Sequence, residues 1–512
     1  MRLRQWPPMP NTRLNAWEEI SCLFLRAGGR WPRPTVANRS QSTKRCSSLA
    51  SLTRGNEELI SALSFVFLTI LNAMFSKYGV FKNATLHALW PGFPVLWLTA
   101  GLLLWVAAAP VARAAIYESE QVRISGFTTL GLARGGNDIL GHRRNMAQEG
   151  NFNNDVAWET DSLIGIQLDT SFSQSLDAAI QAVARKRFNN SVENSIEWAY
   201  LRYRQDRNLT FRAGRIGLDL YMLSEYRNLG FSYLWARPPM EFYSPTAFFY
   251  FDGADMNYAF NLGEGTFNAK FFIGESENQF EFDSKGQPFE LKNLIGTTFS
   301  WESQNWRARF TFTSVDFDDS LNNAVGTESF RELLIPAYQA GWTEAQALLN
   351  DIEVDDNGID YYSIGLAYDN APWVIQTEVS YLDSDYALLQ SYSGRYLSVG
   401  YRLGPTTVYG ILAKGTQTEP RKKVGELPEL LANIPQFNEL REFMQDVFDR
   451  SYAEQESISL GMRWDIHYDT ALKLQWDHAK VQAAGGRLWE QREAPTETEA
   501  LNIYSINLNY IF

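Results

Sequence analysis

The chain has 512 residues, 14% of them aromatic, and an uneven distribution of charge. Of its 46 Lys/Arg and 59 Asp/Glu, residues 1–114 hold 13 and 4, which leaves 33 and 55, a net charge of −22, for residues 115–512. This acidic balance argues against a nucleic-acid partner. Both cysteines, Cys22 and Cys46, lie in the basic part, which excludes disulfides and thiolate metal sites from the rest.

Two apolar runs, Leu59–Phe75 and Phe93–Ala109, stand out in the N-terminal region, whose first 56 residues show no periodicity. The second run is followed by Ala112-Arg113-Ala114, the small-residue pattern of a signal-peptidase site. The pattern predicts cleavage between Ala114 and Ala115. Beyond that point no apolar run has the length of a membrane-spanning helix.

The distance of this site from residue 1 needs an explanation, because a signal peptide begins close to its apolar core. We expect residues 1–73 to be an upstream extension before a true start at Met74, residues 74–114 to be the signal peptide, and residues 115–512 to be the folded protein. The alternative is a genuine extension with a membrane helix over Leu59–Phe75.

From Glu118 onward, segments of roughly ten residues alternate apolar and polar positions. They are connected alternately by very short turns and by long polar loops. This asymmetry is typical of a closed transmembrane barrel, in which an even number of strands leaves both termini on the short-turn side. We therefore predict an all-β fold, an antiparallel transmembrane β-barrel of about 16 strands. The expected strands are Val122–Arg134, Leu163–Phe172, Asp177–Phe188, Ile196–Gln205, Leu209–Ile216, Ala254–Leu262, Phe267–Glu275, Leu294–Glu302, Trp306–Asp316, Ile359–Tyr368, Val374–Leu382, Arg395–Arg402, Thr406–Lys414, Ser457–Ile466, Ala471–Lys480 and Leu501–Phe512.

The same alternation gives each strand a lipid face and a lumen face. In the strand from Ser457, the apolar Ile458 and Leu460 alternate with Arg463 on the opposite face. A charge facing lipid costs roughly 2–4 kcal/mol near the midplane, so charged side chains belong in the lumen. This parity predicts a lumen wall that carries Arg307, Arg309, Arg402, Arg463 and Lys473. On the third to fifth strands it predicts a basic cluster of Arg185, Arg187, Arg202, Arg204 and Arg212.

Two of the long loops contain helical patterns. Apolar residues recur at 3.6 spacing over Ser329–Ile352, with an expected break at Pro336, and over Leu427–Phe448, with an expected break at Pro435. We expect them to pack over or into the outer mouth of the barrel. The alternative is that these helices form a helix-in-groove binding site for a partner protein.

The chain ends on an alternating strand in which Tyr504, Ile506, Leu508, Tyr510 and Phe512 share one face, opposite small polar residues. A soluble edge strand is the alternative, but an aromatic at each end suits the two membrane interfaces. This strand, closing on a C-terminal Phe, resembles those of the outer-membrane β-barrels of Gram-negative bacteria. Over residues 116–512 the chain is similar to the general porins, which are sixteen-stranded and trimeric.

The resemblance implies a cell-outer-membrane location and a third loop that folds into the lumen and constricts the pore. The third long loop here includes residues 217–239 and is rich in Leu, Tyr and Trp. Its acids Asp219 and Glu225 are then expected to face Arg185, Arg202, Arg204 and Arg212 across the narrowest point. The acidic loop motif of that family is not intact in this sequence. The alternative is that these charges are ordinary solvated lumen residues.

The resemblance also implies a water-filled pore for passive diffusion of small hydrophilic solutes and ions. It implies a homotrimer in contact with outer-membrane lipid and lipopolysaccharide, and a terminal Phe512 that the barrel-assembly machinery reads. A substrate-specific channel for sugar, phosphate or dicarboxylate and a structural or adhesin-like barrel are the alternatives.

Catalysis is not expected, because a nucleophile–base pair needs a histidine in a suitable setting. Beyond residue 115 the three histidines, His142, His467 and His478, lie in no hydrolase motif and have no metal-ligand spacing. We therefore expect that the protein is not an enzyme and that it has no cofactor and no metal site.

Overall fold

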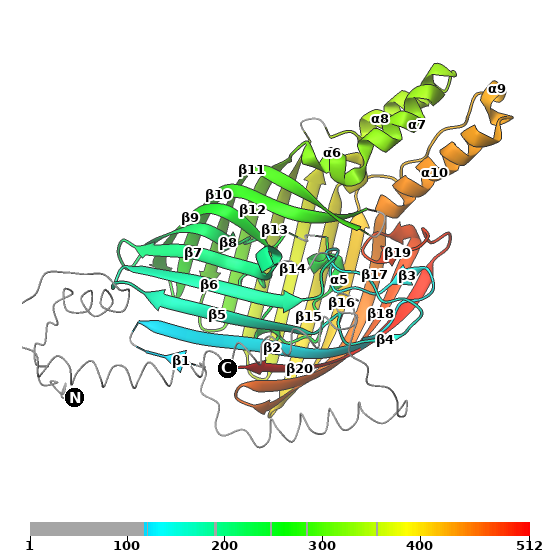
Figure 1. Ribbon diagram of the computed structural model, residues 1–512. Helices are drawn as coiled ribbons and strands as arrows, with labels where there is room; N and C mark the ends of the chain where they lie inside the picture. The colour runs from blue at the N-terminus through cyan, green and yellow to red at the C-terminus, as the bar shows by residue number, and fades with distance from the viewer. Residues whose placement is uncertain (1–116, 120, 189–191, 246–247, 283–284, 355–356) are drawn as a thin grey trace, which may run out of the picture. The chain divides into compact units, whose positions relative to one another are not determined.

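The computed structural model describes residues 117–119, 121–188, 192–245, 248–282, 285–354 and 357–512, which fold into a closed antiparallel β-barrel (Figure 1). The predicted extension, signal peptide and cleavage site lie outside the described residues. Sixteen strands form the barrel: β2 (Val122–Arg134), β5 (Leu163–Ser171), β6 (Leu176–Arg185), β7 (Ile196–Arg204), β8 (Leu209–Gly217), β9 (Tyr250–Leu262), β10 (Gly265–Phe282), β11 (Lys285–Glu302), β12 (Trp306–Phe317), β13 (Gly358–Asn370), β14 (Trp373–Ser384), β15 (Tyr392–Leu403), β16 (Thr406–Gln417), β17 (Ala453–His467), β18 (Thr470–Gly486) and β20 (Glu499–Ile511).

The barrel closes because the first and last of these strands pair with each other. Leu130 of β2 is opposite Leu508 of β20, and the other side of β2 pairs with β5. Closure leaves no barrel strand with an unpaired edge, which is what a strand in lipid requires. The predicted sixteen-stranded antiparallel barrel is confirmed.

The long pair β10 and β11 is the main departure from the predicted bounds, since each strand has 18 residues, twice the predicted length. The extension includes paired polar positions such as Glu277 and Glu290, opposite each other in the ladder. On the β10 side, residues 275–279 are Glu-Ser-Glu-Asn-Gln, so the apolar alternation that marks the other strands is interrupted after Ile273, although Phe289 and Leu291 on β11 are buried.

The outward face of the barrel is apolar and the inward face is buried, as the alternation predicts. On β16, the outward Leu412 is 57% exposed while the adjacent inward Ile411 is 2% exposed. Exposed rings gather toward the short turns: Tyr258, Trp306, Trp373, Trp464 and Tyr468. An apolar outer surface edged by aromatic rings suits lipid and would be unfavourable in water. The barrel is therefore a transmembrane barrel of the outer-membrane type.

Helices lie in two of the long loops, as predicted, and the two loops contact each other. The first loop contains α6 (Ser320–Val325), α7 (Thr327–Gln339) and α8 (Glu344–Ile352), and the second contains α9 (Glu429–Ala432) and α10 (Pro435–Ser451). The rings of Phe330 and Phe443 stack with centroids 5.9 Å apart. Figure 1 shows α7, α8 and α10 extending away from the loop end of the barrel. Among the described residues, no helix is long and apolar enough to cross a membrane.

One of the two predicted helix breaks is wrong. Pro336 lies inside α7, which continues to Gln339, and the break falls instead at Gly341, whose φ is 109°. Pro336 costs α7 one backbone hydrogen bond without ending the helix, whereas the left-handed φ of Gly341 stops it. Pro435 does separate α9 from α10, because it occupies the first turn of α10.

The remaining elements are short. They are β1 (Tyr117–Glu118), β3 (Leu140–Gly141), β4 (Val156–Ala157), β19 (Glu490–Gln491), α4 (Val192–Ser195), α5 (Met240–Tyr243), η3 (Gly230–Ser232) and η4 (Ala387–Leu389). β1 and β4 pair with β2, and β3 pairs with β19.

Candidate channel constriction

The connection between β8 and β9 lies against the inner face of the barrel over its residues 218–245, which we call the inner segment. Its apolar side chains are almost completely buried: Leu218, Leu220, Tyr221, Leu223, Trp235 and Phe242. They pack in one core with inward-facing side chains such as Phe272 and Tyr396. The apolar composition of this loop therefore reflects packing against the wall and not exposure to water.

Hydrogen bonds tie the inner segment to strands around much of the wall. The Trp235 indole donates to Ser398 Oγ on β15 at 2.7 Å, and Ser363 Oγ on β13 donates to the Leu220 carbonyl at 2.7 Å. On the other side, Asn507 Nδ2 of β20 donates to the Ala236 carbonyl at 2.8 Å. The segment thus crosses the interior from the β11–β15 wall to β20.

Lys473 and Arg463, two of the predicted lumen residues, hold the middle of the inner segment. Lys473 is completely buried, and its Nζ donates to the carbonyls of Gly230, Tyr233 and Trp235 at 2.5, 2.5 and 2.8 Å. Arg463 Nη1 donates to the Phe231 carbonyl at 2.7 Å and to that of Tyr233 at 2.9 Å. The wall cations thereby satisfy backbone acceptors that would otherwise be buried without partners.

Glu378 of β14 joins both arms of the inner segment. Its Oε2 accepts from the backbone N–H of Met222 at 2.8 Å, and its Oε1 accepts from the Tyr243 and Tyr396 hydroxyls, the latter at 2.6 Å. The carboxylate is 1% exposed. Two of these donors, Met222 and Tyr243, belong to opposite ends of the segment. The Glu378 carboxylate therefore holds both ends at one position on the wall.

The two acids of the inner segment have different environments. Asp219 has a side chain 3% exposed, with its Oδ2 2.6 Å from Lys270 Nζ and its Oδ1 bound to Arg309. Burial raises the pKa of Asp219, but the charges of Arg309 and Lys270 outweigh it and hold that pKa well below its usual range. Glu225 has a side chain 57% exposed and binds Lys270 at 3.0 Å, and the charge of Lys270 lowers its pKa.

The arginines of the predicted cluster form ion pairs with carboxylates of the wall, and the charge of Arg212 also lowers the pKa of Glu225. That the cluster faces Asp219 and Glu225 across the narrowest point remains a prediction. Arg185 binds Glu197 at 3.0 Å and Asn228 at 2.9 Å, Arg202 binds Asp177 at 2.7 Å together with Arg204, and Arg212 binds Asp255. The cluster itself spans neighbouring strands as expected, since Arg202 is opposite both Asp177 and Arg212. Asp177 and Asp255 stand opposite Arg202 and Arg212 in the strand ladder, so these carboxylates of the wall neutralise the two arginines.

The two other predicted wall arginines also have carboxylate partners. Arg402 binds Asp369 with two hydrogen bonds, and Arg307 binds Glu302 and donates to the Tyr226 hydroxyl at 3.2 Å. Of these, the contact of Arg307 with Tyr226 reaches the inner segment. The role of the charged residues as a constriction remains a prediction.

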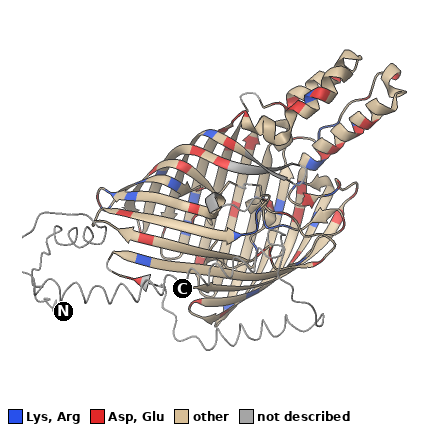
Figure 2. Ribbon diagram, viewed as in Figure 1, with Lys and Arg blue, Asp and Glu red and all other residues tan. Residues whose placement is uncertain are grey.

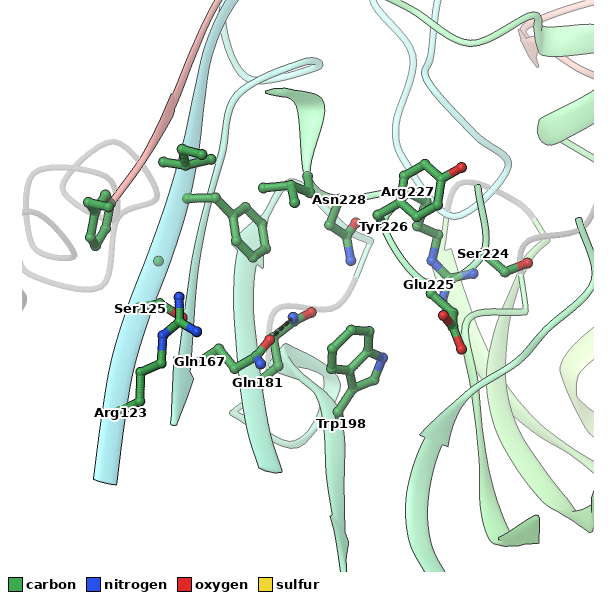
Figure 3. A pocket seen from close by; sticks show the side chains of 15 residues that line it. Arg123, Ser125, Gln167, Gln181, Trp198, Ser224, Glu225, Tyr226, Arg227 and Asn228 are labelled. Carbon is green, nitrogen blue, oxygen red and sulfur yellow. Dashed lines mark hydrogen bonds between the residues drawn. The ribbon is translucent and has the colours of Figure 1, made fainter. Parts of the chain in front are cut away.

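A cavity of about 260 Å³ lies between residues 224–229 of the inner segment and the inner faces of β2, β5, β6 and β7 (Figure 3). Its polar lining includes Arg123, Ser125, Gln167, Gln181 and Glu225. Gln181 Nε2 donates to Gln167 Oε1 at 2.9 Å, and the Trp198 ring borders the same space. Glu225 is thus the predicted constriction acid that reaches an open space.

Most residues of this cavity were missed by the sequence analysis. Arg123, Ser125 and Gln167 have the inward parity of their strands, but Gln167 and Ser125 carry no charge and Arg123 lies outside the predicted cluster. Lys270, the partner of both acids, was also missed, although it shares its strand face with the buried Phe272. The alternation of inward and outward residues along each strand could have identified these residues. Their distance from the inner segment could not be inferred, because it depends on the pairing register of the strands.

The three histidines occupy unrelated sites. His142 is buried beside Arg237, with 3.4 Å between its Nδ1 and the guanidinium, and burial lowers its pKa well below the usual value. His467 lies 2.8 Å from Asp469, and His478 lies 3.0 Å from the Asn502 side chain. No cluster of metal-ligating side chains occurs within the described ranges.

Phe512 completes the junction of the barrel. Its backbone N–H donates to the Gly126 carbonyl at 2.9 Å, and its carbonyl accepts from the Gly126 N–H at 2.7 Å. A Cβ on Gly126 would lie 2.4 Å from the Phe512 ring, so the ring packs directly on this glycine. The terminal residue therefore belongs to the closing ladder even though the last strand ends at Ile511.

Comparison with known proteins gives structural neighbours but no sequence relatives. No family model matches the chain, and no curated protein matches it. OmpF of Salmonella typhi aligns with a TM-score of 0.46 and 8% identity over 78% of this chain and 100% of its own. The anion-selective porin from Comamonas acidovorans aligns at 0.44 and 13%, covering 76% and 99%, and the outer-membrane channel DcaP of Acinetobacter baumannii at 0.43 and 10%, covering 78% and 100%.

The chain has the fold of a sixteen-stranded outer-membrane β-barrel. Strand number, closure and the apolar outer surface define this barrel in the chain itself.

Proposed function

We propose that the protein is an outer-membrane channel through which small hydrophilic solutes and ions diffuse passively. The observation that carries the proposal is the cavity between the inner segment and the β2–β7 wall. Elsewhere the segment is bonded tightly to the wall, so a solute would pass on the side of Arg123, Gln167 and Glu225. Opposite charges and amides favour hydrated solutes over apolar ones in such a passage.

The net charge of the protein does not decide the selectivity of this channel. Acidic and basic residues occur both on the barrel strands and on helices α7–α10 (Figure 2). Charges more than about 8 Å from the passage are largely screened at physiological salt. The charged residues that line the cavity, Arg123, Glu225 and Arg227, are therefore the ones that would set the preference for anions or cations.

Neutralising Glu225 or Arg123 tests the function. We expect Glu225→Gln to shift the reversal potential in a salt gradient toward anion preference and Arg123→Gln to shift it toward cation preference, each by several-fold in permeability ratio. Lys423→Gln, an exposed residue beside the second helical loop, is the charge-matched control and should leave the ratio within error. Wild-type protein without ion conductance in planar bilayers would refute the channel.

A substrate-specific channel is the second candidate. The Trp198 ring beside the bonded Gln167–Gln181 pair combines a flat apolar surface with amide donors and acceptors, an arrangement suited to sugars. A solute flux that saturates with concentration, together with block of the small-ion current by that solute, would favour this candidate over simple diffusion.

The partners of the channel follow from the same proposal. We infer a homotrimer in the outer membrane, lipopolysaccharide as the outer-leaflet neighbour, and recognition of the terminal strand by the barrel-assembly machinery. A structural or adhesin-like role has weaker support, in the exposed Leu333, Leu430 and Phe443 of the helical loops. Transport of this kind needs no catalytic residues and no cofactor.

A further inference from the structure

Two phenylalanines join the helical loops above the barrel. The rings of Phe330 on α7 and Phe443 on α10 lie 5.9 Å apart at an interplanar angle of 16°. Phe330 is 3% exposed and Phe443 is 45% exposed, so Phe443 covers Phe330 and presents much of its own ring to solvent. Leu333, one turn further along α7, is 47% exposed beside the same contact. We call Leu333 and Phe443 the apolar patch.

The apolar patch lies beyond the part of the protein that lipid covers. Helices α7, α8 and α10 extend away from the loop end of the barrel, whereas the lipid-facing residues are on the strands (Figure 1). Ile335 and Tyr338 add exposed apolar surface further along α7. Covering such surface is favourable by about 25 cal/mol per Å². Apolar surface that is exposed outside the membrane is typical of a site for a protein partner.

Three carboxylates border the apolar patch on both helices. Glu332 directly precedes Leu333 on α7. On α10, Glu439 lies one turn before Phe443, and Glu442 directly precedes that ring. All three acids are exposed, and within the described ranges none of them forms a salt bridge. We call these three acids the acidic rim.

The arginines next to the acidic rim are engaged elsewhere. Arg331 binds Glu328 at 3.0 Å and also binds Glu353, and Arg441 Nε donates to the Gly425 carbonyl at 2.8 Å. Helices α7–α10 together carry nine Asp/Glu and three Lys/Arg, a net charge of −6 (Figure 2). The charge that complements this surface is therefore positive.

We propose that the apolar patch and the acidic rim bind a basic amphipathic helix of another protein. Apolar side chains of that helix cover Leu333 and Phe443, and its lysines or arginines meet the acids of α7 and α10. A helix with an apolar stripe between two charged edges matches an apolar centre with acids on both sides. A second copy of this chain does not match, because its helical loops carry the same negative charge. The inference adds a binding role to the proposed channel and does not depend on the passage of ions.

Fluorescence anisotropy of a labelled synthetic peptide tests the proposal, with the whole protein in phosphatidylcholine nanodiscs and the signal of empty nanodiscs subtracted. The probe is an amphipathic helix of leucine and lysine, and the control peptide has glutamate in place of every lysine. We expect saturable binding of the lysine peptide and binding of the control peptide that is weaker by roughly tenfold or more. Added salt should weaken binding of the lysine peptide, because it screens exposed charges.

Two pairs of substitutions test the apolar patch and the acidic rim separately. Leu333→Ser combined with Phe443→Ser should weaken binding of the lysine peptide by roughly tenfold or more, because the apolar surface is lost. Glu332→Gln combined with Glu442→Gln should weaken it by roughly threefold to tenfold. The second pair leaves the contact of Phe330 with Phe443 unchanged, so its effect does not arise from a loss of packing between the loops.

Glu264→Gln combined with Glu497→Gln is the matched control. It removes the same charge from exposed positions outside the helices and should leave binding unchanged. Equal binding of the two peptides, or wild-type binding by either the serine or the glutamine variant, would overturn the proposal. If wild type binds no peptide and the serine variant loses an oligomer in native mass spectrometry, the patch belongs to a second copy and the proposal is wrong. Conductance is measured on the same samples, so a protein that binds the peptide but passes no ions would refute the channel and leave the binding site standing.

Discussion

Lys473 is the residue on which the position of the inner segment most directly depends. Its ammonium group donates to three carbonyls of the segment from a site with no exposed surface. The carbonyls belong to residues within a single stretch of six, so one side chain orders that stretch. The sixteen-stranded ladder does not include these bonds.

Replacing this residue should therefore release the segment without unfolding the barrel. We expect Lys473→Met to raise the mean single-channel current and its noise, because each buried carbonyl left without a donor costs about 1–3 kcal/mol. Heat-modifiable mobility on gels should stay that of a folded barrel. A variant with wild-type current and noise would show that Lys473 does not hold the segment.

Asp219 makes a pH-dependent contribution to the same packing. Its pKa is lower in the folded protein than the usual value of about 3.9, so its ion pairs stabilise the segment above that pH and lose this effect as the pH falls through the folded pKa. The groups that face it are Lys270, Arg309 and, through Lys270, Glu225.

The expected result is a current that is constant from pH 8 to pH 5 and becomes noisy only below about pH 4. Asp219→Asn should be noisy already at pH 7, because it leaves Lys270 and Arg309 with a neutral partner. Single-channel recording over this pH range provides the measurement. Identical traces for the variant and the wild type at all pH values would contradict the role given to the ion pairs.

At the scale of elements, the terminal strand carries the closure of the barrel. Phe512→Asp should abolish assembly, because it places a charge where the ring packs on Gly126 at the lipid-facing junction. Phe512→Tyr keeps a ring and should assemble. Heat-modifiable barrel in outer-membrane fractions is the readout, and wild-type amounts of the Asp variant would count against the prediction.

The strands were predictable because each carries its own signal. Ile458, Leu460 and Trp464 define the outward face of β17 without reference to any other strand, which places Arg463 on the inward face. Leu472 and Leu474 do the same for β18 and place Lys473 on its inward face. The pairings of the site were not predictable, because Asp219 meets Lys270 and Arg309, which lie on β10 and β12 and are fixed by the path of the inner segment. Likewise, Asp177 and Asp255 neutralise the arginines through a register that no single strand contains.

The whole molecule should begin, once mature, at Ala115. Small residues at Ala112 and Ala114 satisfy signal peptidase, and an apolar core of suitable length precedes them. Mass spectrometry of the protein purified from outer membranes should find Ala115 as the first residue. Peptides from residues 1–73 in that material would contradict the expectation.

The same cleavage would leave the mature protein without cysteine, since Cys22 and Cys46 would be removed with the leader. A cysteine introduced at one site is then the only thiol, and its reactivity reports whether water and solutes reach that site. Two inward-facing serines provide a matched pair: Ser125 borders the cavity, and Ser398 is buried beneath Trp235.

Block of single-channel current by a charged methanethiosulfonate reagent tests the central claim, that solutes pass between the inner segment and the β2–β7 wall. We expect the reagent to reduce the current of Ser125→Cys within seconds and to leave that of Ser398→Cys unchanged. Block of Ser398→Cys alone would place the passage on the other side of the inner segment, and equal block of both variants would show that solutes reach both sides. Either result would contradict the account.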